Sequence, residues 1–564
     1  MHHTPRLLLL MTAIAALSFA ACKSNDTSPT RIESLAVAES VTGTPAALDA
    51  FGPDLSKLMP KASLSTAADG QEALDAVRSG AAVAAVVPRG GDGALDGLSA
   101  IDIRSSAVAA FVPFTFPVEG VTSAQLRDLA AGRITNWDVV GGPALLVSIA
   151  VTEPDVMRRT LGVPVAGAVA GDAATALTER PGRMVLALGS SAGALAKPLR
   201  IDGIRPDERG YPIEVQWSVV GRSGDTRAAA LARALSAPAD ERDGSGQVVL
   251  DAVGDIMLGR TVGRSITERG AGYPFEAVAP LLEGSDVRVG NLELPLTERG
   301  TPARKDYTFR APPSVTEGLI GADFDVLTLA NNHMLDYGVE GLLDTVAALE
   351  RAGIAHPGAG RNSDAAHEPA IVRVNGLTLA FLSYVNTPND GRSGWVAEST
   401  RAGADVPGVA WGTAESIRRD VAAARAAADL VIVALHAGYE YSAAPNPVQR
   451  ELARTAVDAG AALVLGAHPH VLQGIEIYKR VPIVYSLGNF VFDVDNDDRR
   501  QPGMPSLLSA VLRIRLDAEG VRGLEVRPAI IDERDGRPIP VTGVAARPVY
   551  DRIYSLTNAL NTGR

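Results

Sequence analysis

The sequence predicts an α/β protein built from two domains, and three observations lead to this prediction. The chain has 564 residues, of which 46% are hydrophobic, and a chain of this length does not bury all its apolar side chains in one core. Apolar runs typical of buried strands are followed by helical patterns, as at residues 326–330 and 339–352. Residues 237–247 are rich in proline, glycine, serine and charged residues, which predicts a linker.

The composition limits the classes of function. There are 53 basic and 65 acidic residues, a formal net charge of −12, and the charges are spread along the chain. Nucleic-acid binding depends on clusters of basic residues, so no nucleic-acid partner is expected. The chain has one cysteine, which excludes an internal disulfide or a cluster of thiolate ligands. An anionic substrate held through a metal stays compatible with this charge.

Residues 1–22 have the pattern of a targeting segment. Arg6 precedes an apolar stretch at residues 7–21 that is short for a bilayer span. Small residues then stand directly before Cys22, although Phe19 occupies a position where leucine is usual. The segment resembles a bacterial lipoprotein signal, which implies an acylated Cys22 and an exported protein held at the extracytoplasmic face of the cell membrane. The alternative is an ordinary secretory signal with an incidental cysteine.

The linker and the targeting segment divide the chain. The predicted parts are the signal peptide 1–22, a polar tether 23–31, a first domain 32–238, the linker 239–246, a second domain 247–535 and a C-terminal extension 536–564.

The first domain contains elements of an α/β fold. Residues 72–79 predict a helix, and residues 82–87 and 107–112 predict strands. The motif GRITNW follows at residues 132–137, and IDGIRP with a later YP lies at residues 201–212. These motifs resemble those of the phosphate-type periplasmic substrate-binding proteins, which implies a two-lobed α/β domain.

The first domain departs from that family at the ligand site. The family's Ser-Gly-Thr phosphate nest has no counterpart, and the matching place is VTEPD at residues 151–155. The carboxylates of Glu153 and Asp155 would repel phosphate. We therefore expect a structural or adaptor domain, or a domain with an altered ligand, that shows no micromolar phosphate binding.

In the second domain, six predicted strands each end in Asp, Asn, Glu or His. The strands lie at residues 248–253, 287–290, 326–330, 429–435, 462–465 and 483–487. Ligands bind at the carboxyl ends of strands in open α/β sheets. Four of the eight histidines of the chain, His333, His436, His468 and His470, lie at these ends, so the pattern predicts a metal site. The alternative is that these residues only cap the helices that follow.

These strand ends lie in longer motifs. The motifs are GDIMLGR, NLELPLT, YTFRAP, ANNHMLDYG, HAGYEY, GAHPHVLQG and YSLGNFVFD, between residues 254 and 493. They resemble the CapA family of capsule (poly-γ-glutamate) synthesis proteins, whose fold is that of the calcineurin-like metallophosphatases. The resemblance implies a four-layer α/β/β/α sandwich for the second domain.

The resemblance also implies roles for individual residues. The implied metal ligands are Asp255, Asn291, Glu293, Asn332, His436, His468 and His470. His333 matches the histidine that protonates the leaving group, and Asp336 is a plausible partner that orients it. Arg260, Arg310, Glu440 and Asn489 are candidate substrate contacts, with a surface or core-rim role as the alternative for the two arginines.

Two departures from the metallophosphatase pattern bear on the metal. Met257 stands where a histidine ligand is usual, and Asn291 stands where a bridging aspartate is usual. Either Glu293 takes the bridging role, or the site holds one ion firmly and a second weakly. The remaining nitrogen and oxygen ligands suit one or two divalent ions of Mn, Zn or Fe.

Two classes of function stay open from the sequence. The first is a capsule component that handles an anionic polymer such as poly-γ-glutamate during synthesis, export or attachment, with other capsule-synthesis proteins as partners. The second is a metal-dependent hydrolase, of phosphoesterase or amidase type, that acts on a cell-surface or periplasmic substrate. The neutral Asn291 favours the capsule component over the hydrolase, because an amide cannot neutralise the charge of two cations as a carboxylate does.

Overall fold

The computed structural model describes residues 40–236 and 246–562, apart from gaps at 44–46, 49–50, 52–54, 56–62, 68, 90–94, 171–172, 179–181, 190–191 and 390–394. The expected signal peptide, tether and nearly all of the linker lie outside the described residues. No described helix is both long enough and apolar enough to cross a membrane.

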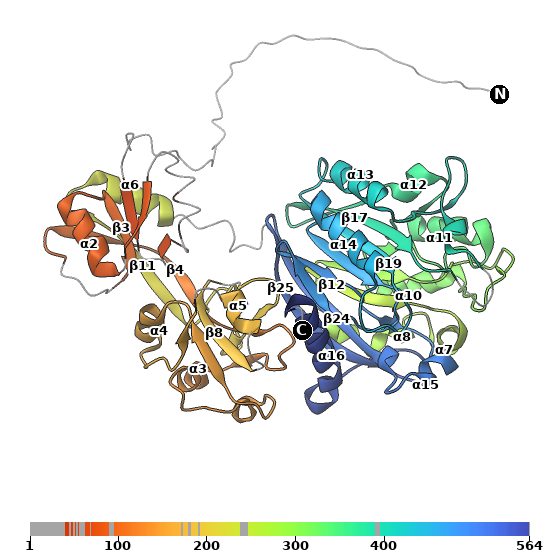
Figure 1. The fold of residues 1–564 in the computed structure, drawn as a ribbon, viewed down its shortest axis with the longest axis horizontal. Coiled ribbons are helices and arrows are strands. Elements are labelled where there is room, and N and C mark those ends of the chain that lie inside the picture. The colour runs from red at the N-terminus through yellow and green to blue at the C-terminus, as the bar shows by residue number, and fades with distance from the viewer. Residues whose placement is uncertain are drawn as a thin grey trace, which may run out of the picture.

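The first domain has two lobes that share two long strands (Figure 1). Strand β4 (Leu98–Pro113) pairs along one part of its length with β11 (Glu214–Arg222) and along another with β8 (Arg183–Leu188). The strand order of the sheet is β2-β1-β3-β11-β4-β8-β6-β7, with β9 (Ala196–Pro198) also paired to β4. The remaining strands are β1 (Ser40–Gly43), β2 (Ser63–Thr66), β3 (Ala84–Pro88), β6 (Ser148–Val151) and β7 (Ala168–Val169). The predicted two-lobed α/β architecture is confirmed.

The predicted elements of this domain form where their patterns place them. Helix α2 (Gly70–Ser79) begins because the side chain of Asp69 accepts from the backbone N–H of Glu72, and it ends at Gly80, whose φ is +83°. Helices of the domain whose bounds lie in the described residues are α2, α3 (Ser123–Ala130), α4 (Pro154–Leu161), α5 (Ala173–Thr178) and α6 (Thr226–Ser236). The VTEPD segment joins β6 to α4, and Glu153 makes no side-chain cap hydrogen bond there.

The second domain stacks two sheets between helices. The first sheet has the order β14-β13-β12-β24-β25-β26, with β23 paired to β12, and the second has the order β16-β17-β19-β20-β22-β21. The first comprises β12 (Gln247–Ile256), β13 (Val287–Leu292), β14 (Val326–Thr328), β23 (Asn489–Val491), β24 (Leu508–Asp517), β25 (Gly520–Ile531) and β26 (Pro538–Pro540). The second comprises β16 (Ala370–Val374), β17 (Leu377–Asn386), β19 (Leu430–Ala437), β20 (Leu463–Ala467), β21 (Ile475–Tyr478) and β22 (Val481–Val484).

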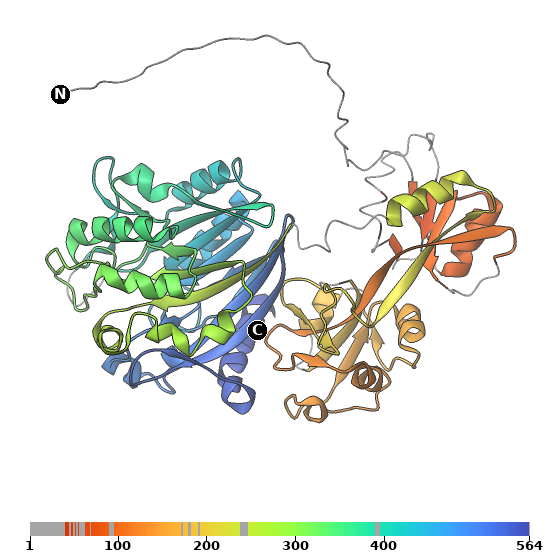
Figure 2. The ribbon, with the colours of Figure 1, turned by 180° about the vertical axis from the view of Figure 1, so that it is seen from behind.

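Three apolar clusters separate four layers. Neighbouring residues of β12 face opposite sides: Ala252 packs between the sheets in the cluster that contains Phe381, whereas Val253 packs toward the outer helices. The outer helices on that side are α7 (Arg260–Arg269), α8 (Tyr273–Glu276), α10 (Thr316–Gly321) and α11 (Gly338–Ala352), which are the green helices in Figure 2. Helices α13 (Ala414–Ala424) and α14 (Pro447–Ala459) cover the second sheet. The implied α/β/β/α sandwich is confirmed.

The segment predicted as a C-terminal extension packs on the second domain. Strand β26 pairs with β25, and α16 (Arg547–Thr562) lies against β21, where Thr557 Oγ1 accepts from the N–H of Ile475 at 3.0 Å. Residues 538–562 therefore pack as part of the same domain.

Candidate metal centre

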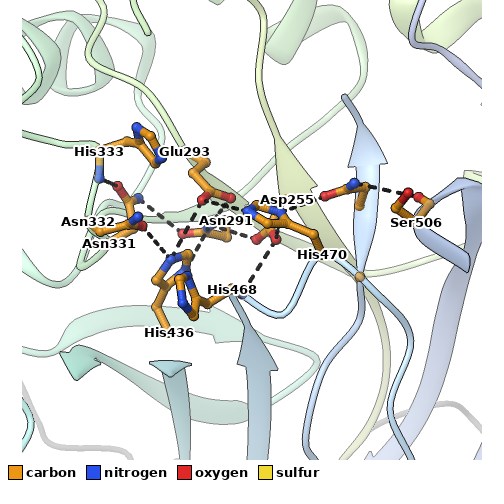
Figure 3. Close-up of polar contacts among 12 residues, drawn as sticks. Asp255, Asn291, Glu293, Asn331, Asn332, His333, His436, His468, His470 and Ser506 are labelled. Atoms are coloured by element: carbon orange, nitrogen blue, oxygen red, sulfur yellow. Dashed lines mark hydrogen bonds and ion pairs between the residues drawn. The ribbon is translucent and has the colours of Figure 1, made fainter. Parts of the chain in front are cut away.

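The strand ends of both sheets converge on one place (Figure 3). In the first sheet, Asp255 lies beside Asn291 on β13 and beside Asn489 on β23. In the second sheet, His436 lies beside Ala467, directly before the loop that carries His468. Because the strands are parallel at these positions, their carboxyl ends bring residues more than 200 positions apart into one cluster.

Glu293 lies at the centre of this cluster. Its Oε1 is 3.6 Å from His436 Nε2 and 3.7 Å from His470 Nε2. Asp255 Oδ2 is 3.3 Å from His470 Nδ1. The ligand atoms form two sets whose members lie within 4.8 Å of one another, one with Asp255, Glu293 and His436, the other with Glu293, His468 and His470. Glu293 belongs to both sets, as a bridging ligand would.

The donors fit a divalent cation. All five side chains of the two sets are buried, yet Glu293 Oε1 and His468 Nδ1 have no hydrogen-bond partner. An unpartnered buried acceptor costs free energy, and a cation at this place would satisfy both atoms. Imidazole nitrogens with carboxylate oxygens are a donor set suited to Mn, Zn or Fe.

Electrostatics agree with a site for positive charge. Burial and the nearby Asp255 raise the pKa of Glu293 well above its usual value. Burial alone would lower the pKa of His470, but Glu293 and Asp255 outweigh it and raise that pKa well above its usual range. Burial and the neighbouring histidines lower the pKa values of His436 and His468 well below their usual range. The carboxylates therefore attract protons or cations, while two imidazoles remain neutral and able to act as ligands.

Asn291 lies inside the cluster as a donor. Its Nδ2 donates to Asp255 Oδ1 at 2.8 Å, and its Oδ1 accepts from Asn331 Nδ2 at 3.2 Å. In this orientation its oxygen points to Asn331, so its role as a metal ligand stays a prediction. Met257 is buried, and its sulfur accepts from the N–H of Gly259 at 3.2 Å, so it supports the loop.

Asn332 and Asn489 both contact histidines of the cluster. Asn332 Oδ1 is 2.8 Å from His436 Nε2, and Asn489 Oδ1 is 2.8 Å from His470 Nδ1. Asn489 therefore orients a histidine, as residues behind metal ligands do. It does not line the cavity described below, where a substrate contact would lie.

His333 and Asp336 form a buried dyad beside the cluster. His333 Nδ1 is 2.7 Å from Asp336 Oδ2, and Lys305 Nζ is 2.7 Å from Asp336 Oδ1. The ring of Phe309 stacks on the imidazole at 4.3 Å between centroids. Burial is the main cause that lowers the pKa of His333 to about 4, so its imidazole is neutral at pH 7.

The backbone of the His468 loop is unusual. The φ angles of His468 and His470 are +95° and +57°, in the left-handed region that non-glycine residues rarely adopt. Such strain persists only where the surroundings impose it, and it is common at functional sites. Here it lets two histidines of one short loop face the same cluster.

A cavity of about 560 Å³ opens above the cluster. Its lining includes His333, Asn332 and His468, together with Glu440, whose role as a substrate contact stays a prediction. Arg260 and Arg310 do not line it: Arg260 Nε pairs with Asp493 Oδ2 at 3.0 Å, and Arg310 lies over the ring of Tyr337 at 4.4 Å. The same lining contains Lys305, Thr387, Trp395 and Tyr441, which the sequence did not mark as site residues.

Comparisons with known proteins identify the family of the second domain. Residues 249–494 match the family described as bacterial capsule synthesis protein PGA_cap. The chain is 37% identical over 292 residues to the PGA biosynthesis protein CapA of Bacillus subtilis, covering 51% of this chain and 72% of that protein. It is 35% identical over 326 residues to the capsule biosynthesis protein CapA of Bacillus anthracis, covering 56% and 74%.

Solved structures similar to part of the chain include an ABC-type phosphate transport receptor from Vibrio cholerae, 16% identical, with 36% of this chain and 96% of that chain covered and a TM-score of 0.31. Another is PstS from Borrelia burgdorferi, 14% identical, with 36% and 94% covered and a TM-score of 0.26. Scores of this size carry no argument about function. The sequence relatives, at more than 30% identity over more than two thirds of their length, show that the chain belongs to the CapA family of bacterial capsule synthesis proteins.

Proposed function

We propose that this protein is a surface-anchored component of poly-γ-glutamate capsule biosynthesis, export or attachment, and that it works through a divalent metal at the strand-end cluster. The observation that carries the proposal is the shared Glu293, whose unpartnered oxygen faces histidines from two different strand ends. The names of the CapA relatives support the capsule role.

The residues divide into holders of the ion and groups that handle the substrate. Asp255, Glu293, His436, His468 and His470 would hold one or two ions of Mn, Zn or Fe, with Asn332 completing the set. A bound ion would act as a Lewis acid toward a phosphoryl or acyl oxygen. The cavity above the cluster is the place for the anionic polymer or phosphoester.

A metal-dependent hydrolase is the second candidate, and the His333–Asp336 dyad favours it. With Asp336 Oδ2 at 2.7 Å, the His333 Nδ1 proton is held by the carboxylate, so that Nε2 carries no proton at neutral pH and is a hydrogen-bond acceptor. To protonate a leaving group, His333 needs an anionic substrate that raises this pKa. Lys305, bonded to the same carboxylate, holds the dyad in place.

Turnover separates the two candidates. Hydrolysis of a phosphodiester, a phosphomonoester and poly-γ-glutamate is measured with Mn and with Zn, on the wild type, on His333→Ala and on a control, His356→Ala. If the protein is a hydrolase, His333→Ala lowers the rate by on the order of 10²-fold or more while metal content persists. His356 makes one side-chain hydrogen bond among the described residues, to the carbonyl of Ile354, and its substitution should leave the rate unchanged.

The capsule role gives a different result. If the protein is a capsule component, none of the three compounds should be hydrolysed. His468→Ala should then weaken poly-γ-glutamate binding, and His333→Ala should hardly change it. Turnover that survives His333→Ala would contradict the assigned role of this histidine, and the absence of both turnover and polymer binding would contradict both candidates.

The anchor is tested separately. Cys22→Ala should leave unprocessed precursor and move the mature protein out of the detergent phase, because acylation needs the thiol. Unchanged partitioning would indicate an ordinary secreted protein.

A further inference from the structure

A second cavity lies where the two domains meet. The N–H of Leu524 in β25 donates to the carbonyl of Ala194 at 3.0 Å, and Phe114 of the first domain packs in the apolar cluster between the sheets. Figure 1 shows β25 on the side of the second domain that faces the first. Beside this contact is a cavity of about 210 Å³ lined by both domains.

The charged groups around this cavity are mostly basic. They are Lys197, Arg205, Arg513, Arg515 and Arg522, against Asp207, Asp517 and Glu525. Three of the basic groups are neutralised by close carboxylates: Lys197 by Glu119, Arg513 by Asp251 and Arg522 by Asp517.

Arg205 and Arg515 are less well compensated. Arg205 uses its Nε to contact Asp207 at 3.0 Å. The nearest carboxylate to Arg515 is Glu525 at 3.7 Å, and that carboxylate already accepts from Arg527 Nε at 2.8 Å. Among the described residues, no hydrogen bond is found for the terminal nitrogens of Arg205 or for the guanidinium of Arg515.

The positive charges of Arg205 and Arg515 repel each other across the domain boundary. The side chain of Arg205 is 7% exposed and that of Arg515 is 24% exposed. Burial, with Arg205 as the next cause, lowers the pKa of Arg515 to about 10. Two guanidinium groups with unused donors that line the same cavity are a favourable environment for an anion.

We propose that the inter-domain cavity binds a small tetrahedral oxyanion, such as phosphate or sulfate, between Arg205 of the first domain and Arg515 of the second. The anion would accept hydrogen bonds from both guanidinium groups and neutralise their repulsion. Because one arginine comes from each domain, anion binding would strengthen the contact between the domains. This site is separate from the strand-end cluster and from the VTEPD segment.

Isothermal calorimetry on the full chain tests the proposal, with inorganic phosphate and sulfate titrated separately in a chloride buffer. The protein is first stripped of metal, so that phosphate cannot bind an ion at the strand-end cluster. We expect one anion per chain, and at least tenfold weaker binding in Arg515→Gln and in Arg205→Gln. Arg522→Gln is the matched control, because it removes a rim arginine already paired with Asp517 and Glu519.

Arg515→Gln could weaken anion binding by disturbing the fold, and Arg515→Lys is the control for this effect. Lysine keeps the positive charge but lacks the planar set of N–H donors of arginine. Arg515→Lys should bind the anion more weakly than the wild type but better than Arg515→Gln. Phosphate should also raise the melting temperature of the wild type and not that of Arg515→Gln. No binding heat at millimolar anion, or binding that Arg205→Gln and Arg515→Gln leave unchanged, would overturn the proposal.

Discussion

Strand β12 carries two buried aspartates, four residues apart, in opposite surroundings. Asp251 is fully buried and is held by Arg513, whose Nε and terminal nitrogen donate to its two oxygens at 2.8 Å and 2.7 Å. Asp255 is equally buried, but its close partners are Asn291 and His470, and no lysine or arginine ion pair to it is found in the described part of the chain.

The difference separates a structural charge from a functional one. A buried carboxylate with a bidentate arginine has its charge and hydrogen bonds satisfied within the chain. The two buried carboxylates Asp255 and Glu293 raise the pKa of His470 and leave negative charge that a proton or a cation must balance. The pair of Asp251 and Arg513 therefore joins the neighbouring strands β12 and β24 of the first sheet, whereas the region around Asp255 is suited to a ligand.

Glu293→Gln is the strongest challenge to the functional side of this comparison. We expect the wild type to carry about one to two transition-metal ions per chain, and the variant to bind them at least about 100-fold more weakly, beyond the 10–100-fold typical of supporting residues. The metal-free variant should be no less stable than the metal-free wild type, because the substitution removes a buried negative charge. Elemental analysis and metal titration measure the first effect, and denaturant unfolding measures the second.

Asp251→Asn is the matched control and the second prediction. It leaves the guanidinium of Arg513 buried without its carboxylate, which should cost about 3–5 kcal/mol in the free energy of unfolding. Metal content should not change, since Asp251 lies outside both ligand sets. If Asp251→Asn also lost metal, the two aspartates would not be independent and the comparison would fail.

Much of the site was predictable because its residues follow apolar strand patterns. Asp255, His436 and His468 each come at or just after a run that the period of buried strands identifies. Parallel strands bring such ends to one edge of a sheet, so the cluster follows from the pattern without any distance information. The same reasoning placed helix α11 within one residue of its observed start.

Other features depend on contacts that the pattern does not contain. Lys305 lies in a loop with no periodicity, and its place beside Asp336 comes only from the folding of two distant segments. The direction of the Asn291 amide is set by Asn331 and Thr328 on neighbouring segments. Strand β26 has only three residues, of which two are prolines, and this composition does not predict a strand, which is why residues 538–540 were expected in an extension.

Glu525 extends the comparison to pH, because its pKa moves in the direction opposite to that of Glu293. Burial would raise the pKa of Glu525, but Arg527 and the other nearby cations outweigh it and lower it from 4.5 to about 2. A lowered pKa contributes stability that is present above about pH 4.5 and is lost as the pH falls toward about 2. At 1.36 kcal/mol per pKa unit, the contribution is about 3 kcal/mol.

The measurement is denaturant unfolding of the wild type and of Glu525→Gln at a series of pH values. The variant should be less stable than the wild type by up to about 3 kcal/mol near pH 7, and the gap should close as the pH falls toward 2. A gap that stays constant across this range would mean that the substitution acts through packing and not through charge.

The smallest expected effect concerns two buried threonines that differ in the same way as the two aspartates. Thr387 lines the cavity above the metal cluster, and its hydroxyl has no hydrogen-bond partner. Thr345 is fully buried, and its hydroxyl donates to the carbonyl of Gly341 and accepts from the N–H of Leu296, both at 2.7 Å. Valine has nearly the shape of threonine, so the same substitution at both positions compares a hydroxyl that has hydrogen-bond partners with one that has none.

Thr345→Val should lower the free energy of unfolding by about 1–3 kcal/mol, because it leaves a buried N–H without its acceptor. Thr387→Val should leave it unchanged or raise it by up to about 1 kcal/mol, because it removes an unsatisfied hydroxyl. If the Thr387 hydroxyl faces the ligand, the same variant should weaken poly-γ-glutamate binding a few-fold, as expected for the loss of one hydrogen bond of about 0.5–1.5 kcal/mol. Denaturant unfolding and polymer binding on the two variants measure these effects. A loss of stability at Thr387 equal to that at Thr345 would show that the hydroxyl is satisfied within the fold, and it would remove Thr387 from the ligand-binding wall.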